Sequence, residues 1–312
     1  MVNVQVVPYN GWEHCISMDN GNIKIIITSD VGPRIIYCGP ADNDVNVFHQ
    51  RKGQQGSANA KEWMIYGGHR LWHSPQEGFR PNQPDNSPVP YTIHQNSVEM
   101  NVPEETETKI QKYLFISMAE DEPRIIIKHC IYNRGLWPIK LSTWGMSCMC
   151  EEGLTILPVP QEQTPDYYPN FSITYWPWTK PNDGRFVIGE KYMTLRQEPE
   201  NKQWFKIAYR NTENWGAYLY SGYLFVKIYH LDRNAEYPDF NSSFAVYTDN
   251  DMVELETMGP LNTVNPGEYA EHTDEWYLCK DVEFPSNEKE IEEKIGKHIE
   301  SILKKTIGGG NG

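Results

Sequence analysis

The chain has 312 residues, and its 42 acidic and 28 basic side chains give a formal net charge of −14. Such a field repels a phosphate backbone, so nucleic acid is not expected as a partner. Charged residues make up only 22% and aromatic residues 12%, a balance that can bury a core and disfavours disorder. No run approaches the roughly 18 apolar residues of a membrane span, and the N-terminal segment does not resemble a signal peptide. We therefore expect a soluble cytoplasmic protein without a membrane partner.

The six cysteines of the chain are expected to be reduced thiols, because nothing in the sequence indicates export. Cys148 and Cys150 alternate on what looks like a strand and so share one face. There is no second pair and no histidine close in sequence, and buried structural thiols are therefore a better interpretation than a metal site. No metal is predicted.

Short runs rich in Ile, Val, Tyr, Phe and Thr, separated by Gly, Pro, Asn and Asp, follow one another along most of the chain. The predicted strands are 23–28, 110–118, 124–132, 139–149, 204–209, 217–229 and 252–258. No helical period appears between them, which excludes parallel βαβ units and favours antiparallel strands. They are too many for one flat sheet, so the sequence predicts an all-β architecture of two packed antiparallel sheets.

Two proline-rich stretches interrupt the strands. Residues 74–90 contain five prolines, and residues 157–181 contain six together with several aromatic side chains, including Trp176 and Trp178. Long loops of this kind are often functional. The alternative is that they are lids packed over a sheet edge.

One helix is predicted, at the C-terminal end. Ser286 follows Pro285 as a candidate N-cap, and an apolar stripe runs through Ile291, Ile295, Ile299, Ile302 and Leu303. We expect this helix, over residues 286–307, to dock on the β body. The expected division is one β domain over 1–285, with residues 286–312, the helix and a Gly-rich tail, packed on it.

A first polar segment lies within Trp63–His73, where His69, Arg70 and Trp72 follow two glycines. Imidazole exchanges protons near neutral pH, and an indole face can stack on the apolar face of a sugar. A structural role for His69 is the alternative, and the two glycines and Pro75 argue against a helix here.

A second polar segment is Met252–Pro260. Along a strand, Glu254 and Glu256 point to the same face at about 6.5–7 Å, and two carboxylates in one cleft raise each other's proton affinity. That suits a general acid or base, whereas the alternative is a solvated outer face. His272, at the start of a predicted final strand, faces the same cleft or else lies at a strand edge.

The residues of the second segment resemble a known family. Glu254–Thr257, followed by Gly259–Leu261 and the turn Pro266–Glu268, is similar to the late strand, loop and turn of the galactose mutarotase-like superfamily, which includes the aldose 1-epimerases. In that family the Glu of a Leu-Glu-Thr motif is the catalytic base, which implies that role for Glu256. The resemblance further implies a β-supersandwich with a sugar-binding sheet face.

Two further segments support or limit this resemblance. Gly68–Leu71 is similar to a sugar-contacting segment of the family, and Asn133 to the residue that opens its central strand pair. The family's mid-chain His, which protonates the ring oxygen, would fall within 142–146, where this chain has Trp144 and no His.

The resemblance implies an aldose 1-epimerase-like isomerase that acts on a small-molecule or oligomeric carbohydrate without metal or organic cofactor. Its base would be Glu256, and its acid His69 or, less favoured, His272. Arg70 and Glu254 would orient hydroxyl groups. The stacking side chains would be Trp72, Trp144, Trp176 and Trp178. Alternatives are a non-catalytic carbohydrate-binding protein and a glycoside hydrolase or lyase on the same fold.

Overall fold

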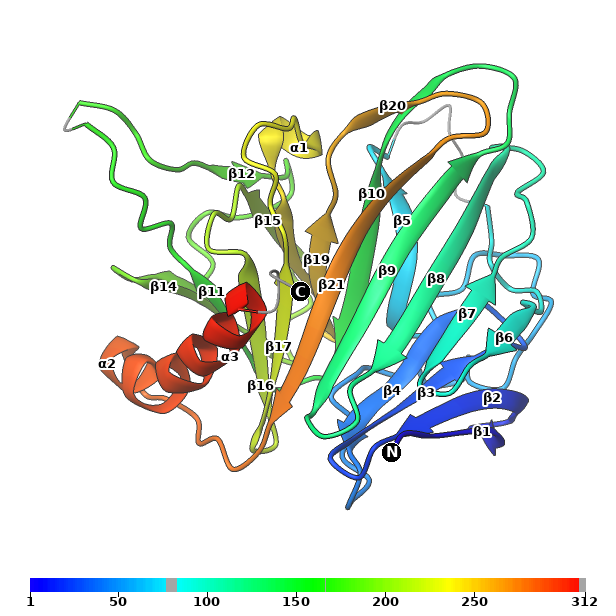
Figure 1. Cartoon of the computed structure of the whole chain (residues 1–312). Helices are drawn as coiled ribbons and strands as arrows, with labels where there is room; N and C mark the ends of the chain where they lie inside the picture. The colour runs from blue at the N-terminus through cyan, green and yellow to red at the C-terminus, as the bar shows by residue number, and fades with distance from the viewer. Residues whose placement is uncertain (77–82, 166, 309–312) are drawn as a thin grey trace.

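The computed structural model describes residues 1–76, 83–165 and 167–308. Two antiparallel sheets pack face to face, and a helical segment lies on one of them (Figure 1). The predicted all-β supersandwich with a C-terminal helix is confirmed. No helix in this part of the chain is long and apolar enough to cross a membrane.

The first sheet has the order β1-β2-β3-β4-β5-β10-β19-β18-β15-β12, and the short strand β20 also pairs with β10. Its strands are β1 (Asn3–Tyr9), β2 (Trp12–Asp19), β3 (Ile23–Thr28), β4 (Arg34–Pro40), β5 (Gly68–Ser74), β10 (Ile139–Met149), β12 (Ile173–Tyr175), β15 (Phe205–Tyr209), β18 (Phe244–Thr248), β19 (Val253–Met258) and β20 (Asn262–Val264).

The second sheet has the order β13-β14-β11-β16-β17-β21-β9-β8-β7-β6. Its strands are β6 (Tyr91–Ile93), β7 (Ser97–Asn101), β8 (Ile110–Met118), β9 (Arg124–Asn133), β11 (Leu154–Pro158), β13 (Phe186–Ile188), β14 (Tyr192–Arg196), β16 (Trp215–Tyr220), β17 (Tyr223–Tyr229) and β21 (Tyr269–Cys279).

The main core lies between the sheets. In β8, every second side chain from Ile110 to Met118 is buried and the others are half-buried, as expected for a strand with one face on a core. By contrast, all residues of β5 and β19 are buried. The centre of the first sheet is therefore covered on both faces, and its outward face, away from the second sheet, carries buried polar side chains.

Most predicted strands match the structure to within one residue, but the predicted strand 217–229 is wrong. It is a hairpin of β16 and β17, whose ends pair Tyr220 with Tyr223. Ser221 and Gly222 form the turn with φ of 50° and 82°. A turn with these left-handed values is compatible with the right-handed twist of the flanking strands. The sequence did not predict the turn because an apolar run continues on either side of it.

The C-terminal helical segment consists of α2 (Glu288–Ile291), the π-helical turn η1 (Glu292–Gly296) and α3 (Lys297–Gly308). Its N-cap is Asn287 rather than the predicted Ser286, because the Asn287 side chain accepts the Glu290 N–H at 3.1 Å. The isoleucine stripe packs with β11, β16 and β17 on the outer face of the second sheet. Residues 309–312 of the Gly-rich tail, and residues 77–82 of the proline-rich stretch 74–90, lie outside the described residues.

Candidate functional site

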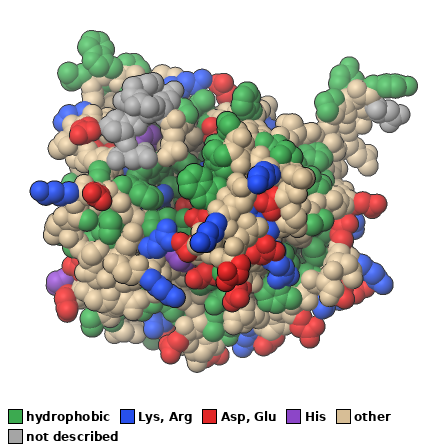
Figure 2. Space-filling view, turned by 180° about the vertical axis from the view of Figure 1, so that it is seen from behind, with side chains coloured by type: hydrophobic (Ala, Val, Ile, Leu, Met, Phe, Trp, Pro, Cys, Tyr) green, Lys and Arg blue, Asp and Glu red, His purple; other side chains and the backbone are tan. Residues whose placement is uncertain are grey.

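Five predicted site residues on its strands share the outward face of the first sheet: Arg70, Trp72, Trp144, Glu254 and Glu256. The register places Arg70 opposite Met146 and Met146 opposite Glu256, and it pairs Trp72 with Trp144. Residues directly opposite on neighbouring strands project to the same side. Figure 2 views the molecule from this side, where acidic and basic side chains lie close together among hydrophobic ones.

Glu256 is the centre of this face and is fully buried. Lys206 of β15 reaches across β18 and donates from Nζ to Oε1 and Oε2 of Glu256, at 2.9 and 2.7 Å. The indole Nε1 of Trp144 donates to Oε2 at 3.0 Å. The residue of β18 opposite Glu256 is Ala245, whose small side chain leaves room for the long arm of Lys206.

The ammonium group of Lys206 lies between two indole rings. Nζ is 4.8 Å from the ring centroid of Trp144 and 4.8 Å from that of Trp176. Both distances are within the range of cation–π attraction. Only 11% of the Lys206 side chain is exposed, so the two rings and the carboxylate fix a buried cation directly over Glu256.

Burial raises the pKa of Glu256 to about 7, because desolvation outweighs the opposing effect of Lys206 and because Glu254 adds negative charge. Asp239 also acts on Glu256, and burial raises the pKa of Asp239 as well. Asp239 belongs to the short turn α1 (Pro238–Asn241), in which Asp239, Phe240 and Asn241 have φ of 48°, 58° and 67°. Consecutive left-handed non-glycine residues are strained, and such strain clusters at functional sites.

Arg70 and Glu254 lie beside Glu256 on the same face. The Arg70 guanidinium is buried over the rings of Trp63 and Trp72, with its central carbon 5.0 and 4.6 Å from the two centroids. Its Nε and Nη1 have no hydrogen-bond partner among the described residues. Glu254 Oε1 accepts from the thiol of Cys148 at 3.4 Å. Arg70 thus keeps two buried donors on this face without a hydrogen-bond partner among the described residues.

Trp178 lies at the edge of the site. Its ring is edge-to-face with Tyr247 at 6.1 Å and with Trp204 at 6.0 Å between centroids. Tyr247 pairs with Lys206 on one side and with Glu254 on the other, so this aromatic edge is continuous with the Glu256 centre.

The predicted acid–base pair of Glu256 and His69 is wrong. His69 pairs with Ser147, one position away from the Arg70–Met146 pair, and adjacent strand residues point to opposite faces. Its imidazole is therefore fully buried between the two sheets, where Nδ1 is 2.9 Å from Ser147 Oγ.

His272 is also placed away from the outward face. It lies on β21 of the second sheet, with Nδ1 2.7 Å from Thr143 Oγ1 and Nε2 3.2 Å from Thr257 Oγ1. Neither expected position is correct: His272 does not share a cleft with Glu256, because it points between the sheets, and it is not at a sheet edge, because β21 lies between β17 and β9.

The two histidines belong to a buried polar network. His69 Nε2 and His129 Nε2 are 2.8 Å apart, His129 stacks on His272 at 4.4 Å, and Lys227 Nζ is 3.2 Å from Asp274 Oδ2. Burial lowers the pKa of both His69 and His129 well below the usual value. The network thus joins the sheets through neutral imidazoles and one buried ion pair.

His69, His129 and Asp274 could in principle hold a metal, since one ligand atom from each lies within 4.8 Å of the others. The two imidazole nitrogens, however, already share a hydrogen bond. The Lys227 ammonium also contacts the carboxylate and donates to Gly145 O at 2.8 Å. A divalent cation would lie beside this ammonium, so the donor set fits a lysine better than a metal.

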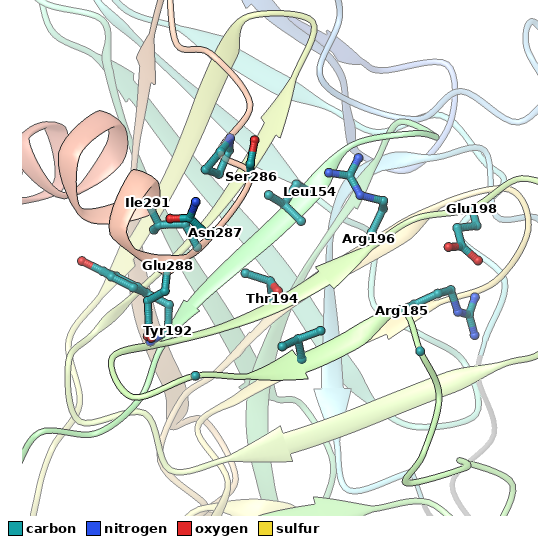
Figure 3. Close-up of a pocket in the computed structure, with 14 residues that line it drawn as sticks. Leu154, Arg185, Tyr192, Thr194, Arg196, Glu198, Ser286, Asn287, Glu288 and Ile291 are labelled. Atoms are coloured by element: carbon teal, nitrogen blue, oxygen red, sulfur yellow. The ribbon is translucent and has the colours of Figure 1, made fainter.

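A separate pocket of about 290 Å³ lies between the start of the C-terminal helix and β14 (Figure 3). The Glu288 carboxylate at its edge accepts the backbone N–H groups of Lys191 and Tyr192 at 2.6 and 3.0 Å. Arg185 is paired with Asp183 at 2.8 Å. Glu288 and Asp183 are thus engaged by neighbours, whereas Arg185 keeps Nη1 without a hydrogen-bond partner among the described residues.

Sequence reasoning missed Lys206 and Asp239. Lys206 alternates with apolar residues in β15, a pattern that equally indicates a solvated face. Asp239 lies in a turn without a local motif. Lys206 reaches the site through the pairing of β15 with β18, and Asp239 through the turn that precedes β18, and the sequence displays neither.

No family model and no curated protein matches the sequence, but solved structures match its fold. A putative aldose 1-epimerase from Escherichia coli K12 is 11% identical, with a TM-score of 0.56 over 90% of this chain and 100% of that one. A galactose mutarotase-like protein from Clostridium acetobutylicum is 12% identical, with a TM-score of 0.55 over 89% and 99%.

A third similar structure is a TPR-domain containing protein from Parabacteroides distasonis, 13% identical with a TM-score of 0.58. The match covers 88% of this chain and 49% of that one, so this chain spans about half of that protein. At these identities the similarity shows the fold alone: a β-sandwich like that of galactose mutarotase-like proteins.

Proposed function

We propose that this protein binds carbohydrate on the outward face of the first sheet and acts there as an aldose 1-epimerase-like isomerase. The observation that carries the proposal is Glu256, a buried carboxylate with a pKa of about 7 that hydrogen-bonds the ammonium of Lys206. An acid and a base side by side, near neutral pH, are what mutarotation requires. The fold shared with aldose 1-epimerase and galactose mutarotase-like proteins supports this function.

In this mechanism, Glu256 accepts the proton of the anomeric hydroxyl while Lys206 donates a proton from Nζ to the ring oxygen. The C1–ring-oxygen bond breaks, C1 becomes an aldehyde carbon, and the open chain rotates about C1–C2. Closure on the opposite face of the aldehyde returns each proton to its donor. Lys206 thus takes the role first predicted for His69, and Arg70 and Glu254 bind other hydroxyl groups of the sugar.

Binding must open the Lys206–Glu256 contact, because the ammonium occupies both carboxylate oxygens. A hydroxyl that inserts between them can donate to Glu256, and the ring oxygen can accept from Lys206. Trp144 and Trp176 keep the displaced ammonium close, since their ring faces already hold it.

The same contact favours a second candidate, a carbohydrate-binding protein without catalysis. A carboxylate held by Lys206 and Trp144 accepts three hydrogen bonds, and Lys206 keeps the proton affinity of the carboxylate below what burial alone would give. In this alternative the site recognises a sugar without opening its ring.

The test is proton NMR of freshly dissolved, anomerically pure aldoses with and without protein. We expect faster anomer exchange with the native protein and a loss of about 10²- to 10⁴-fold in Glu256→Gln, since Gln cannot accept the proton. Affinity for the sugar should change only a few-fold. Binding without faster exchange would replace the isomerase with the binding protein, and the absence of both would reject the proposal.

A further inference from the structure

An exposed aromatic surface adjoins the Glu256 site. Its members are Trp178, Trp204 and Tyr247, which we call the aromatic shelf, and their rings form a continuous edge-to-face chain. Trp204 is 56% exposed and Trp178 is 36% exposed. Large aromatic side chains are rarely left open to solvent in a contiguous group unless they bind something.

The aromatic shelf is adjacent to the residues of the Glu256 site. Trp204 is two residues before Lys206 along the chain, a separation of about 6.6 Å on an extended strand, and Tyr247 is the direct cross-strand partner of Lys206. Tyr247 also lies opposite Glu254. If one ring of an oligosaccharide lies over Glu256, the next ring of the same oligosaccharide would therefore lie over the shelf.

The shelf is held in place by polar contacts. Gln203 Nε2 donates to the carbonyl oxygens of Trp178 and Trp204 at 3.4 and 3.1 Å. Thr179 Oγ1 donates to Lys206 O at 2.8 Å and accepts the Lys206 N–H at 3.1 Å. The loop that carries Trp178 is thus fastened to β15. A preorganised aromatic surface binds at a smaller entropic cost than a mobile one.

Polar groups accompany the rings. The Tyr247 hydroxyl donates to Asp249 Oδ2 at 3.2 Å, and the Gln203 amide contacts the backbone carbonyls of both tryptophans. Sugars combine an apolar C–H face with hydroxyl groups around the ring, so a surface of flat rings with polar neighbours suits them better than a purely apolar peptide segment.

We propose that the aromatic shelf is a second sugar-binding position and that the ligand is an oligosaccharide, with one ring over Glu256 and the next over Trp178 and Trp204. This inference rests on the proposed function, because the neighbouring site is what assigns a carbohydrate to the shelf. It specifies the ligand as a chain of sugars rather than a free monosaccharide.

The test measures dissociation constants by calorimetry for glucose, galactose and mannose and for β-1,4-linked disaccharides and trisaccharides of each. For the series that binds, we expect the native protein to hold the trisaccharide about 10-fold more tightly than the monosaccharide. Trp204→Ala should abolish this gain and leave the monosaccharide constant within about two-fold. Trp204→Tyr should restore part of the gain, because it keeps a ring.

The matched control is Trp137→Ala, which removes a tryptophan that is 77% exposed in the turn between β9 and β10. It should leave all constants unchanged. Equal affinities for monosaccharide and trisaccharide in the native protein would contradict a second sugar-binding position on the shelf while leaving the proposed function intact. So would an equal loss for both ligands in Trp204→Ala. If no saccharide of any length binds, both the shelf and the proposed function are wrong.

Discussion

Glu256 and Lys206 show why a side chain's partner matters more to its chemistry than its own sequence motif. The alternation of Glu254 and Glu256 was sufficient to predict that they share a face. Nothing nearby indicates that the carboxylate is held by Lys206, which lies 50 residues earlier and two strands away. The proton donor of the proposed reaction therefore had to come from the structure.

His69 was misassigned for a reason that is local. Its face depends on where β5 begins, and Gly67 and Gly68 just before and at that point have φ of 102° and 67°. These left-handed residues break the two-residue alternation, so counting from Trp63 does not establish which way His69 points. A shift of one residue moves a side chain to the other face of a sheet.

The pH dependence of the proposed reaction follows from Glu256. As a base it must be ionised, and burial raises its pKa to about 7. We expect kcat/KM for anomer exchange to rise with pH through about 7 and then level off, measured by NMR between pH 5 and 9 after subtraction of the buffer-catalysed rate. A profile that is flat across this range would exclude Glu256 as the base.

Lys206→Gln tests the proposed acid. The variant cannot donate the ammonium proton, so exchange should slow by about 10²-fold or more. Removing the positive charge should also move the rise in kcat/KM to higher pH, because Lys206 lowers the pKa of Glu256. A role limited to the charge of Lys206 would shift the midpoint but leave the plateau rate, reached where Glu256 is ionised, within a few-fold of the native value. Lys202→Gln, an exposed position four residues earlier, is the control and should behave as the native protein does.

At the scale of elements, the strands were predictable where alternation was long. The predicted strand 110–118 matches β8 and 139–149 matches β10. Short edge strands such as β12 and β13, three residues each, carry too little pattern to be recognised. Their existence depends on pairing with β15 and β14, which is tertiary information.

The helix was predictable because apolar residues at helical spacing indicate one face that packs against the rest of the protein. Ile295 is fully buried against the outer face of the second sheet. Ile295→Ala should lower the free energy of unfolding by about 2–5 kcal/mol, through lost burial and the cavity left behind. Urea denaturation followed by circular dichroism measures this. Leu136→Ala, at a side chain 84% exposed, should change it by less than about 0.5 kcal/mol.

At the scale of the whole molecule, the buried network is a polar link between two largely apolar sheet faces. The carbonyl of His272 can only accept, so His129 donates to it from Nδ1 at 3.3 Å. A neutral His129 then accepts at Nε2 from His69, which in turn accepts at Nδ1 from the Ser147 hydroxyl. The chain of hydrogen bonds is complete only while both imidazoles are neutral.

Acid should therefore destabilise the fold through this network, and Glu256 should partly mask the effect. Burial lowers the pKa values of His69 and His129 in the folded protein. In the unfolded chain these groups take up protons near pH 6.5. The stabilisation from their neutral forms is therefore complete above about pH 6.5 and is lost as the pH falls below it. The raised pKa of Glu256 has the opposite sign: its protonation stabilises the folded state as pH falls from 7 towards 4.5.

Glu256→Gln removes that opposing contribution and separates the two effects. In this variant the free energy of unfolding, from urea titrations at pH 7, 6 and 5, should fall by about 3–4 kcal/mol over the range, because two histidines each contribute up to about 1.4 kcal/mol per pH unit. The native protein should lose distinctly less, since Glu256 takes up a proton in the folded state over the same interval. Equal slopes for the two proteins would mean that the carboxyl of Glu256 titrates alike in the folded and unfolded chains. A flat slope in the variant would mean that the imidazoles between the sheets tolerate protonation.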